Sequence, residues 1–415
     1  MRLLNVSDFS FKEFWSPWTT PKYAILSHRW GDDEVSYKEW RKVSRTTGPG
    51  YEKIRNFCRT ARGFGYEWVW VDTCCIDKRS SAELTEAINS MYAWYERASL
   101  CIVYLQDVGC KSHSEVKGAL GYLGYSAWFT RGWTLQEILA PTNILFFSLE
   151  WTVLGRITAQ ELRSSDSLGS YSSIASLVAS ITGIDKYSLK DPKMMRRRSL
   201  AVKMSWAAKR QTSREEDMAY CLLGLFDVNM PLLYGEGANK AFMRLQLEII
   251  KKSSDETIFA WRAPDHGTWY GLLAGSPRAF QHAGNISVIK DDDDENDANS
   301  VLGTHTNAVP RLPYSMTNRG LEFRARAWGH HRKHGTYYVR LECEERGDQY
   351  QWQSCMLVLR GTLDTELERV RDVYRKNTED LGESNARQRH WDEVVRQLRL
   401  QDLGIFCFEV PQSGL

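Results

Sequence analysis

Residues 68–105 constrain the fold of this chain most strongly, because they have the pattern of a single strand–helix–strand unit. Trp68 to Val71 is a short apolar run rich in β-branched and aromatic residues, as in a buried strand. Ser80 followed by Glu83 predicts a helix start with a capping box. Cys101 to Leu105 is a second apolar run and predicts the next strand. A helix between two buried strands is the repeating unit of α/β folds.

Polar residues follow two of the predicted strands at the point where each strand ends. Asp72 to Asp77 follows the strand that begins at Trp68, and His28, Arg29 and Asp32 follow a strand at 23–26. In open parallel sheets, ligands bind beyond the carboxyl ends of the strands. The residues His28, Arg29 and Asp32 could therefore bind phosphate or ribose, or they could form an ion-paired loop.

The order of predicted elements divides the chain into three parts. Strands and helices alternate to residue 155, which predicts a small parallel sheet with helices on both faces in a domain 1–155. An irregular, packed arm is expected at 1–22, because this segment contains Trp15, Pro17, Trp18 and Pro21. A helical extension is expected at 156–262, with helices at 199–210, 217–226 and 238–252. A β-rich domain is expected at 263–415, with strands at 337–342, 356–359 and 404–410 and charged helical stretches near 364–377 and 385–400.

Composition excludes several broad classes. The net charge of +2 gives no general reason to expect nucleic acid as a partner. The sequence predicts neither a membrane-spanning helix nor a secretory signal. Nine cysteines, with Cys74 and Cys75 adjacent and no CxxC motif, fit reduced thiols in the cytoplasm better than disulfides or a metal site.

Glu137 is the first candidate for chemistry. We predict a short helix from Trp133 to Leu139, ended by Pro141, in which Glu137 lies one turn after Trp133 and Thr134. A carboxylate beside an aromatic ring can hold a ribose or stabilise a sugar cation. The alternative is a surface glutamate on a short helix.

The segment 72–77 allows three interpretations. Asp72 could contact a ligand, or it could bond its own backbone in a turn, and for Asp77 we favour the turn. Cys74 or Cys75 could be a nucleophile if a histidine lay near it, and His28 is the plausible partner. Small buried thiols are the commoner case.

Four blocks of the sequence resemble the HET (heterokaryon incompatibility) domain of filamentous fungi. They are YAILSHRWG (23–31), WVWVDTCCIDK (68–78), SSAELTEAINSMYAWYERASLCIVYL (80–105) and RGWTLQEILAP (131–141). Residues 205–261 are similar to the segment that follows HET domains in many members of the family. The resemblance implies a fungal protein that acts in heterokaryon incompatibility, programmed cell death and innate immunity.

HET domains in turn resemble Toll/interleukin-receptor (TIR) domains, which implies a TIR/flavodoxin-like sheet. The block that begins at Ser27 is similar to the first TIR box, and the block 133–138 is similar to the TIR segment that contains the catalytic glutamate of NAD-cleaving enzymes. Glu137 occupies that position. Thr134 stands where the TIR segment has a cysteine, and the loop 78–80 lacks the usual glycine.

The TIR resemblance implies a site and a reaction. Glu137 would be catalytic in cleavage of NAD⁺, with no cofactor and no metal, and Trp133 or Trp30 would stack on nicotinamide. The substrate-binding residues implied are Ser27, His28, Arg29, Trp30, Asp32, Asp72, Cys74 and Trp133. A homo-oligomer is expected when the protein is active, and an incompatibility or NLR-type protein is the expected partner. The alternative is a non-enzymatic module that signals cell death by self-association or by binding a partner.

Overall fold

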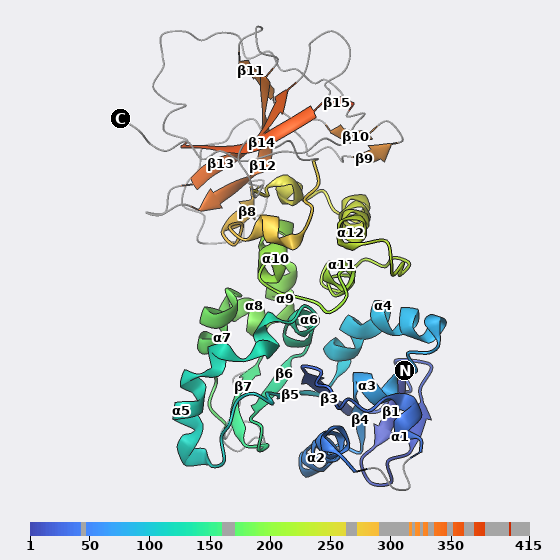
Figure 1. Cartoon of the computed structure of the whole chain (residues 1–415). Coiled ribbons are helices and arrows are strands. Elements are labelled where there is room, and N and C mark those ends of the chain that lie inside the picture. The colour runs from blue at the N-terminus through green and yellow to red at the C-terminus, as the bar shows by residue number, and fades with distance from the viewer. Residues whose placement is uncertain are drawn as a thin grey trace. The chain divides into compact units, whose positions relative to one another are not determined.

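The computed structural model describes residues 1–42, 47–159, 171–262 and 272–289 and, beyond these, strand segments between Ser315 and Arg399 (Figure 1). These residues form two compact units. The first unit contains residues 1–197 and 210–236, and the second contains residues 198–209 and 237–415. The chain thus leaves the first unit at Arg198 and re-enters it at Arg210. The three-part division at 155 and 262 stays a prediction.

A seven-stranded mixed sheet forms the centre of the first unit (Figure 1). Its strands lie in the order β2-β1-β4-β3-β5-β6-β7. Their bounds are Arg2–Asn5 (β1), Phe11–Glu13 (β2), Tyr23–His28 (β3), Trp68–Trp70 (β4), Leu100–Tyr104 (β5), Asn143–Phe147 (β6) and Val153–Thr158 (β7). The middle strands β4, β3, β5 and β6 pair in parallel, whereas β1, β2 and β7 pair antiparallel. The predicted parallel sheet is therefore confirmed in its middle and wrong at both edges.

The N-terminal edge of the sheet corrects the prediction of an irregular, packed arm at 1–22. Leu3 and Leu4 are buried, and β1 pairs with both β2 and β4. Trp15 and Trp18, which suggested packing, are 83% and 95% exposed. The apolar pair that anchors this segment is thus the leucines, which are too short a run to stand out as a strand in the sequence.

The opposite edge adds a strand where helix was expected to begin. The chain turns at Trp151, which has a φ of 61°, and returns as β7 beside β6. Gly155 in β7 is required there, because a Cβ atom would lie 2.4 Å from Cγ2 of Ile174. The backbone N–H of Ile174 donates to the carbonyl oxygen of Arg156, so the segment around Ile174 is packed against the sheet edge.

Helices cover both faces of this sheet (Figure 1). The connection from β3 to β4 and the connection from β4 to β5 cross the sheet in opposite directions. Because such crossovers are right-handed, α2 and α4 lie on opposite faces. The helices of this unit are Tyr37–Trp40 (α1), Pro49–Gly63 (α2), Asp72–Cys75 (α3), Ser81–Arg97 (α4), Val116–Gly121 (α5), Thr134–Leu139 (α6), Ala175–Thr182 (α7), Lys186–Lys190 (α8), Pro192–Arg196 (α9) and Asp217–Tyr220 (α11).

Helix α4 begins as predicted, but only half of the predicted capping box forms. The Ser80 side chain accepts a hydrogen bond from the backbone N–H of Glu83. The Glu83 carboxylate does not return to the backbone of Ser80. It accepts instead from the backbone N–H of Asp77 and from Arg2. The helix start is therefore tied to the loop before it and to β1.

The second unit contains Leu200–Ala207 (α10) and Ala238–Lys252 (α12), together with strands Ile286–Val288 (β8), Ser315–Thr317 (β9), Gly320–Phe323 (β10), Ala327–His330 (β11), Thr336–Arg346 (β12), Trp352–Arg360 (β13), Arg369–Asn377 (β14) and Leu398–Arg399 (β15). Helix α12 has the predicted bounds, and the apolar residues of one face are buried: Phe242, Leu245, Ile249 and Ile250. Helix α10 matches the core of the helix predicted at 199–210. The helix predicted at 217–226 is shorter, since α11 ends at Tyr220.

The C-terminal predictions are tested only where residues are described. Strands β12 and β13 cover the predicted strands at 337–342 and 356–359. The helix predicted near 364–377 is wrong, because residues 369–377 form β14 and pair antiparallel with β13. The predicted strand at 404–410 lies outside the described residues, as does the helical stretch near 385–400 apart from β15.

Candidate active site

Glu137 lies inside the first unit, where its side chain meets the carboxyl end of β3. Helix α6 carries it, and the residue is only 6% exposed. The Ser27 hydroxyl, at the end of β3, donates a hydrogen bond of 2.5 Å to Oε2 of Glu137. Trp128 Nε1 donates to the same hydroxyl at 2.9 Å. Because the indole N–H can only donate, the Ser27 proton is left to point at the carboxyl group.

Burial controls the protonation of this carboxyl group. Burial, assisted by the negative charge of Asp72, raises the pKa of Glu137 to about 8. The hydrogen bond from Ser27 and the positive charges of Arg131 and Arg210 act in the opposite direction. A carboxyl group with such a pKa exchanges its proton near neutral pH, which is typical of groups in catalytic sites.

His28 is the centre of a second polar group beside Ser27. Its Nε2 lies 3.4 Å from the Glu34 carboxylate, and its Nδ1 lies 3.9 Å from Oδ1 of Asp72. Glu34 also binds Lys53 at 2.5 Å and the backbone N–H of Gly31 at 2.8 Å. Burial, followed by the positive charge of Lys53, lowers the pKa of the His28 imidazole. The imidazole is therefore neutral at physiological pH, although two carboxylates face it.

Trp30 forms the exposed rim of this region. The residue is 40% exposed, and its Nε1 donates a hydrogen bond of 2.7 Å to Oδ2 of Asp72. Lys78 Nζ lies 3.5 Å from the centroid of the Trp30 ring, and Arg131 Cζ lies 4.8 Å from it. An aromatic face with two cations thus lies beside Asp72. Asp72 also affects the pKa of Glu137.

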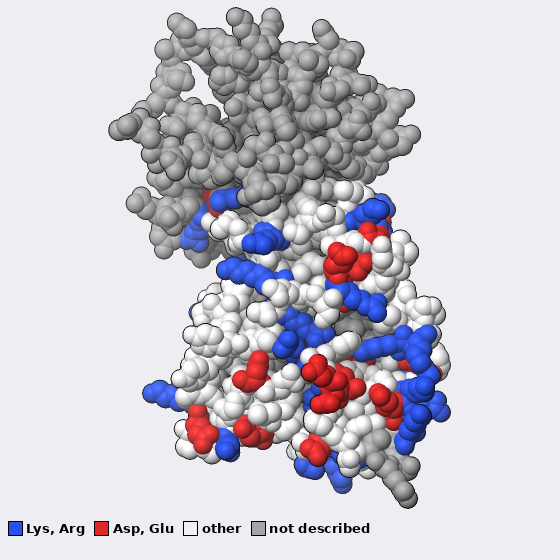
Figure 2. All heavy atoms as spheres, viewed as in Figure 1, with Lys and Arg blue, Asp and Glu red and all other residues white. Residues whose placement is uncertain are grey.

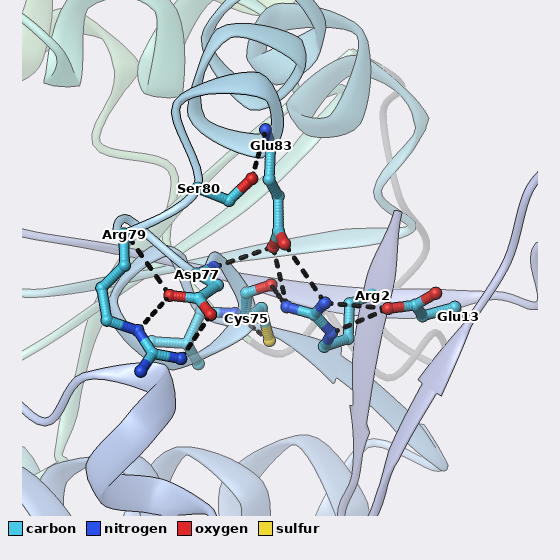
Figure 3. A network of polar contacts seen from close by, with 8 residues as sticks. Arg2, Glu13, Cys75, Asp77, Arg79, Ser80 and Glu83 are labelled. Atoms are coloured by element: carbon cyan, nitrogen blue, oxygen red, sulfur yellow. Dashed lines mark hydrogen bonds and ion pairs between the residues drawn. The ribbon is translucent and has the colours of Figure 1, made fainter.

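The loop that carries Lys78 is held from β1 by Arg2 (Figure 3). The Arg2 guanidinium binds the Glu83 carboxylate at 2.7 Å and the carbonyl oxygen of Cys75 at 3.2 Å. Its other edge binds Glu13 at 2.8 Å. Glu83 also accepts a hydrogen bond from the backbone N–H of Asp77. Arg2 therefore contacts the turn between α3 and α4 at both ends, at Cys75 directly and at Glu83 in the first turn of α4.

The start of α6 is held by residues that lie far along the chain. Arg210 donates to the carbonyl oxygen of Arg131 at 2.8 Å and to the Thr134 hydroxyl at 2.9 Å. The backbone N–H of Gly132 donates to the carbonyl oxygen of Gln211 at 2.8 Å. Residues 210–236, which follow the excursion into the second unit, therefore help to position the helix that carries Glu137.

The structure brings together five of the nine predicted site residues: Ser27, His28, Trp30, Asp72 and Glu137. Trp133 is directed elsewhere, since its Nε1 donates to Asp217 at 3.1 Å. Arg29 and Asp32 are exposed, and neither makes a hydrogen bond or ion pair within the described part of the chain. Their assignment as binding residues stays a prediction.

Two alternatives from the sequence lose support. A surface glutamate was the other interpretation of Glu137, and its burial contradicts that interpretation. Cys74 is fully buried, and burial raises the pKa of its thiol well above the usual value, which disfavours the reactive thiolate. Asp77 has the turn role that we favoured, because it accepts from the backbone N–H and guanidinium of Arg79.

Sequence reasoning missed four residues that shape this site: Lys78, Trp128, Arg131 and Arg210. Arg131 lies in the RGW block beside Glu137, so its position was a usable signal. Lys78 lies two residues before the predicted helix start, where its local pattern is that of any solvated loop lysine. Trp128 and Arg210 had no local signal, because their roles depend on contacts with residues more than 70 positions away.

On the face of the molecule that Figure 2 draws, basic and acidic side chains of the described residues lie intermixed. Among the residues that the structure describes, no helix is long and apolar enough to cross a membrane. Within the same residues, no group of three or more His, Cys, Asp or Glu side chains could hold a metal ion.

Comparison with known proteins defines the class of this part of the chain. Residues 23–121 match the family described as heterokaryon incompatibility protein (HET). This match covers β3, β4, α4 and β5, and it includes Ser27, Trp30 and Asp72. The chain therefore carries a HET domain, as the sequence blocks indicated.

A relative with a longer chain extends the comparison. The chain is 43% identical over 235 residues to the vegetative incompatibility protein HET-E-1 of Podospora anserina. The aligned region covers 56% of this chain and 16% of the relative, so the chain corresponds to a small part of that protein's length. No solved structure matches the chain.

Proposed function

We propose that this protein is an effector of heterokaryon incompatibility and cell death whose HET domain cleaves NAD⁺. The similarity to HET-E-1 supports the incompatibility role. The buried carboxyl group of Glu137, held by Ser27 at the carboxyl end of β3, is the observation that carries the enzymatic proposal. The resemblance of the 133–138 block to the TIR segment with its catalytic glutamate gives that carboxyl group its role.

The proposed substrate lies across the carboxyl ends of the parallel strands. Its nicotinamide ribose reaches Glu137, which holds the ribose hydroxyls. The exposed face of Trp30 supplies a surface for stacking against an aromatic ring. Asp72 orients that indole by accepting its N–H.

Cleavage breaks the bond between ribose C1′ and the nicotinamide nitrogen. The electron pair of that bond leaves with nicotinamide, and positive charge develops on the ribose as in glycoside hydrolysis. A fixed carboxylate beside the ribose stabilises this charge. Water then adds to C1′ and loses a proton, so the products are ADP-ribose, nicotinamide and one proton.

The burial of Glu137 fits this reaction. Before substrate binds, its carboxyl group holds a proton near neutral pH, because its pKa is about 8. The positive charge of the nicotinamide ring of NAD⁺ favours the carboxylate instead. We infer that substrate binding releases this proton and creates the anion that the transition state requires.

The first test measures NAD⁺ loss with purified full-length protein. We expect Glu137→Gln to reduce the rate on the order of a hundredfold or more. Glu86→Gln, on the exposed face of α4, is the matched control and should retain the wild-type rate. Equal rates for wild type and Glu137→Gln would contradict the role of Glu137. Because TIR enzymes act as assemblies, the assay includes protein concentrations that favour self-association.

A second test measures NAD⁺ in cells that express the protein. Loss of NAD⁺ with wild type but not with Glu137→Gln would support the enzymatic route to cell death. Death of wild-type cells with NAD⁺ unchanged would instead favour a module that acts by binding a partner. One observation favours that second candidate, since Trp15 and Trp18 expose large aromatic side chains on one segment. Trp18→Ser would then abolish killing, whereas the enzymatic proposal predicts no effect.

A further inference from the structure

The rim of the candidate site carries two cations on one aromatic ring. Lys78 Nζ lies 3.5 Å from the centroid of the Trp30 ring, and Arg131 Cζ lies 4.8 Å from it. The ring itself is fixed in its plane by the hydrogen bond of 2.7 Å from its Nε1 to Asp72. Attraction to the ring therefore holds both cations at a defined place.

Neither cation has an anionic partner within the described residues. No carboxylate there lies within ion-pair distance of Lys78 or Arg131, and neither side chain donates a hydrogen bond. Other basic side chains of this unit are paired: Arg2 with Glu13 and Glu83, Lys53 with Glu34, and Arg79 with Asp77.

The charges around this rim favour the binding of an anion. Burial lowers the pKa of Lys78, and the positive charge of Arg131 lowers it further, while the negative charges of Asp72 and Glu34 act in the opposite direction. The two rim cations thus repel each other. An anion bound between them would relieve that repulsion.

The rim lies next to the carboxyl group that we assign to catalysis. Arg131 precedes α6 and is one of the charges that lower the pKa of Glu137. Asp72 links the two places, because it holds Trp30 and also raises that pKa. A ligand bound against the exposed face of Trp30 therefore lies close to both cations.

We propose that Lys78 and Arg131 bind the phosphate groups of the substrate. A guanidinium group matches phosphate with two parallel hydrogen bonds, and an ammonium group adds a point charge. The ligand class is a nucleotide with a pyrophosphate bridge, with an aromatic ring placed against Trp30. The identification of that nucleotide as NAD⁺ rests on the proposed function, whereas the phosphate site itself does not.

Binding can be measured without turnover. Titration calorimetry of the full chain would use inorganic pyrophosphate, ADP-ribose and nicotinamide riboside, of which the last has no phosphate. We expect Lys78→Gln and Arg131→Gln each to weaken pyrophosphate and ADP-ribose about tenfold, as loss of one charged hydrogen bond does. The affinity for nicotinamide riboside should not change.

Two other cations on aromatic rings supply matched controls. Lys186 lies over Tyr187 at 5.1 Å and Arg41 lies over Tyr37 at 5.6 Å, and both cationic residues are exposed. Lys186→Gln and Arg41→Gln remove the same charges elsewhere and should leave both affinities at the wild-type value. Equal weakening by the controls would overturn the site, because it would show a response to net charge alone.

The outcomes separate this proposal from the enzymatic one. Unchanged ADP-ribose affinity in both rim variants, or no pyrophosphate binding by wild type, overturns the phosphate site. Weakened binding in the rim variants supports it, even if purified protein does not cleave NAD⁺. In that case only the cleavage reaction is overturned. Cleavage of NAD⁺ by Lys78→Gln with an unchanged KM would overturn the phosphate site alone.

Discussion

Two opposing effects of the fold act on the ionisation of the Glu137 carboxyl group. Its carboxyl group is buried, which penalises the ionised form, and it accepts a hydrogen bond from Ser27, which favours that form. Burial is the stronger effect, so the native state holds the proton to a higher pH than the unfolded chain does. Because of this difference, the ionisation of Glu137 contributes to the pH dependence of the free energy of unfolding.

We predict a specific dependence of stability on pH. The pKa of Glu137 is about 8 in the native state and near 4.5 in an unperturbed glutamate. Between these values the native state binds the proton that the unfolded state has lost. The free energy of unfolding therefore falls as pH rises, by up to ~1.4 kcal/mol per pH unit for this group.

Glu137→Gln removes that proton while keeping the size of the side chain. Urea unfolding at pH 5, 6, 7 and 8 should give a free-energy difference between variant and wild type that grows in favour of the variant as pH rises. The exposed control Glu86→Gln should show no such trend. A constant difference across this range would mean that Glu137 ionises normally in the native state.

Some residues of the candidate site could be predicted from the sequence, and others could not. Ser27 and His28 lie at the carboxyl end of β3, and Asp72 follows β4, so a general rule about parallel sheets located this region. Glu137 was a candidate from its helical spacing, but that spacing also fits a surface glutamate, and only the resemblance gave it a catalytic role. Trp128 could not be found, because its role depends on one hydrogen bond to Ser27 across 101 positions.

At the scale of elements, the short helix α6 depends on the segment 210–212. Gly132 lies two residues before α6, and its backbone N–H binds the carbonyl oxygen of Gln211. A Cβ atom at Gly132 would lie 2.5 Å from Cγ2 of Thr212 and 3.2 Å from Sγ of Cys221. The Thr212 hydroxyl donates to the carbonyl oxygen of Arg214 at 2.6 Å, so the methyl group cannot easily turn away.

We therefore predict that Gly132→Ala destabilises the protein by ~1–3 kcal/mol, the usual cost of overpacking. Gly118→Ala in α5 is the control, because no atom lies within 4 Å of the place that its new methyl group would take, and it should stabilise by ~0.5–1 kcal/mol. Urea unfolding measures both. Thr212→Ser removes the obstructing methyl group, so the double variant should recover most of the loss. Additive effects of the two substitutions would show that this contact is not the cause.

Elements were predictable where one face of a segment is strongly apolar. Helix α12 has the bounds expected from its pattern, and strands β4 and β5 lie within one residue of the expected bounds. Strands β1 and β7 were missed because each is fixed by a neighbour distant in sequence or by an edge pairing. Strand β14 was expected to be helical, since its charged residues are compatible with a helix and its partner β13 could not be known in advance.

At the scale of the whole molecule, the first unit is discontinuous in sequence. Residues 210–236 return to it after residues 198–209 have joined the second unit. Their contacts are close: a Cβ atom at Gly224 would lie 2.0 Å from Cβ of Tyr92 in α4. The HET family match at 23–121 contains neither this segment nor Glu137. No local pattern in the sequence could show that the chain leaves the unit and returns.

We predict that a chain ending at residue 155, the domain boundary expected from the sequence, does not fold cooperatively. It would lose the hydrogen bonds of Arg210 and Gln211 to the start of α6 and the packing of Gly224 on α4. A chain ending at residue 262 keeps these contacts and should show a cooperative thermal transition by tryptophan fluorescence.

The same pair of truncations decides how the site is held together. If residues 1–262 melt cooperatively and residues 1–155 do not, the segment 210–236 is part of the structure that positions Glu137. If residues 1–155 melt as sharply as the full chain, the sheet with α2 and α4 is sufficient by itself. The hydrogen bonds of Arg210 would then be dispensable for folding, and Glu137 would be positioned by Ser27 and Trp128 alone.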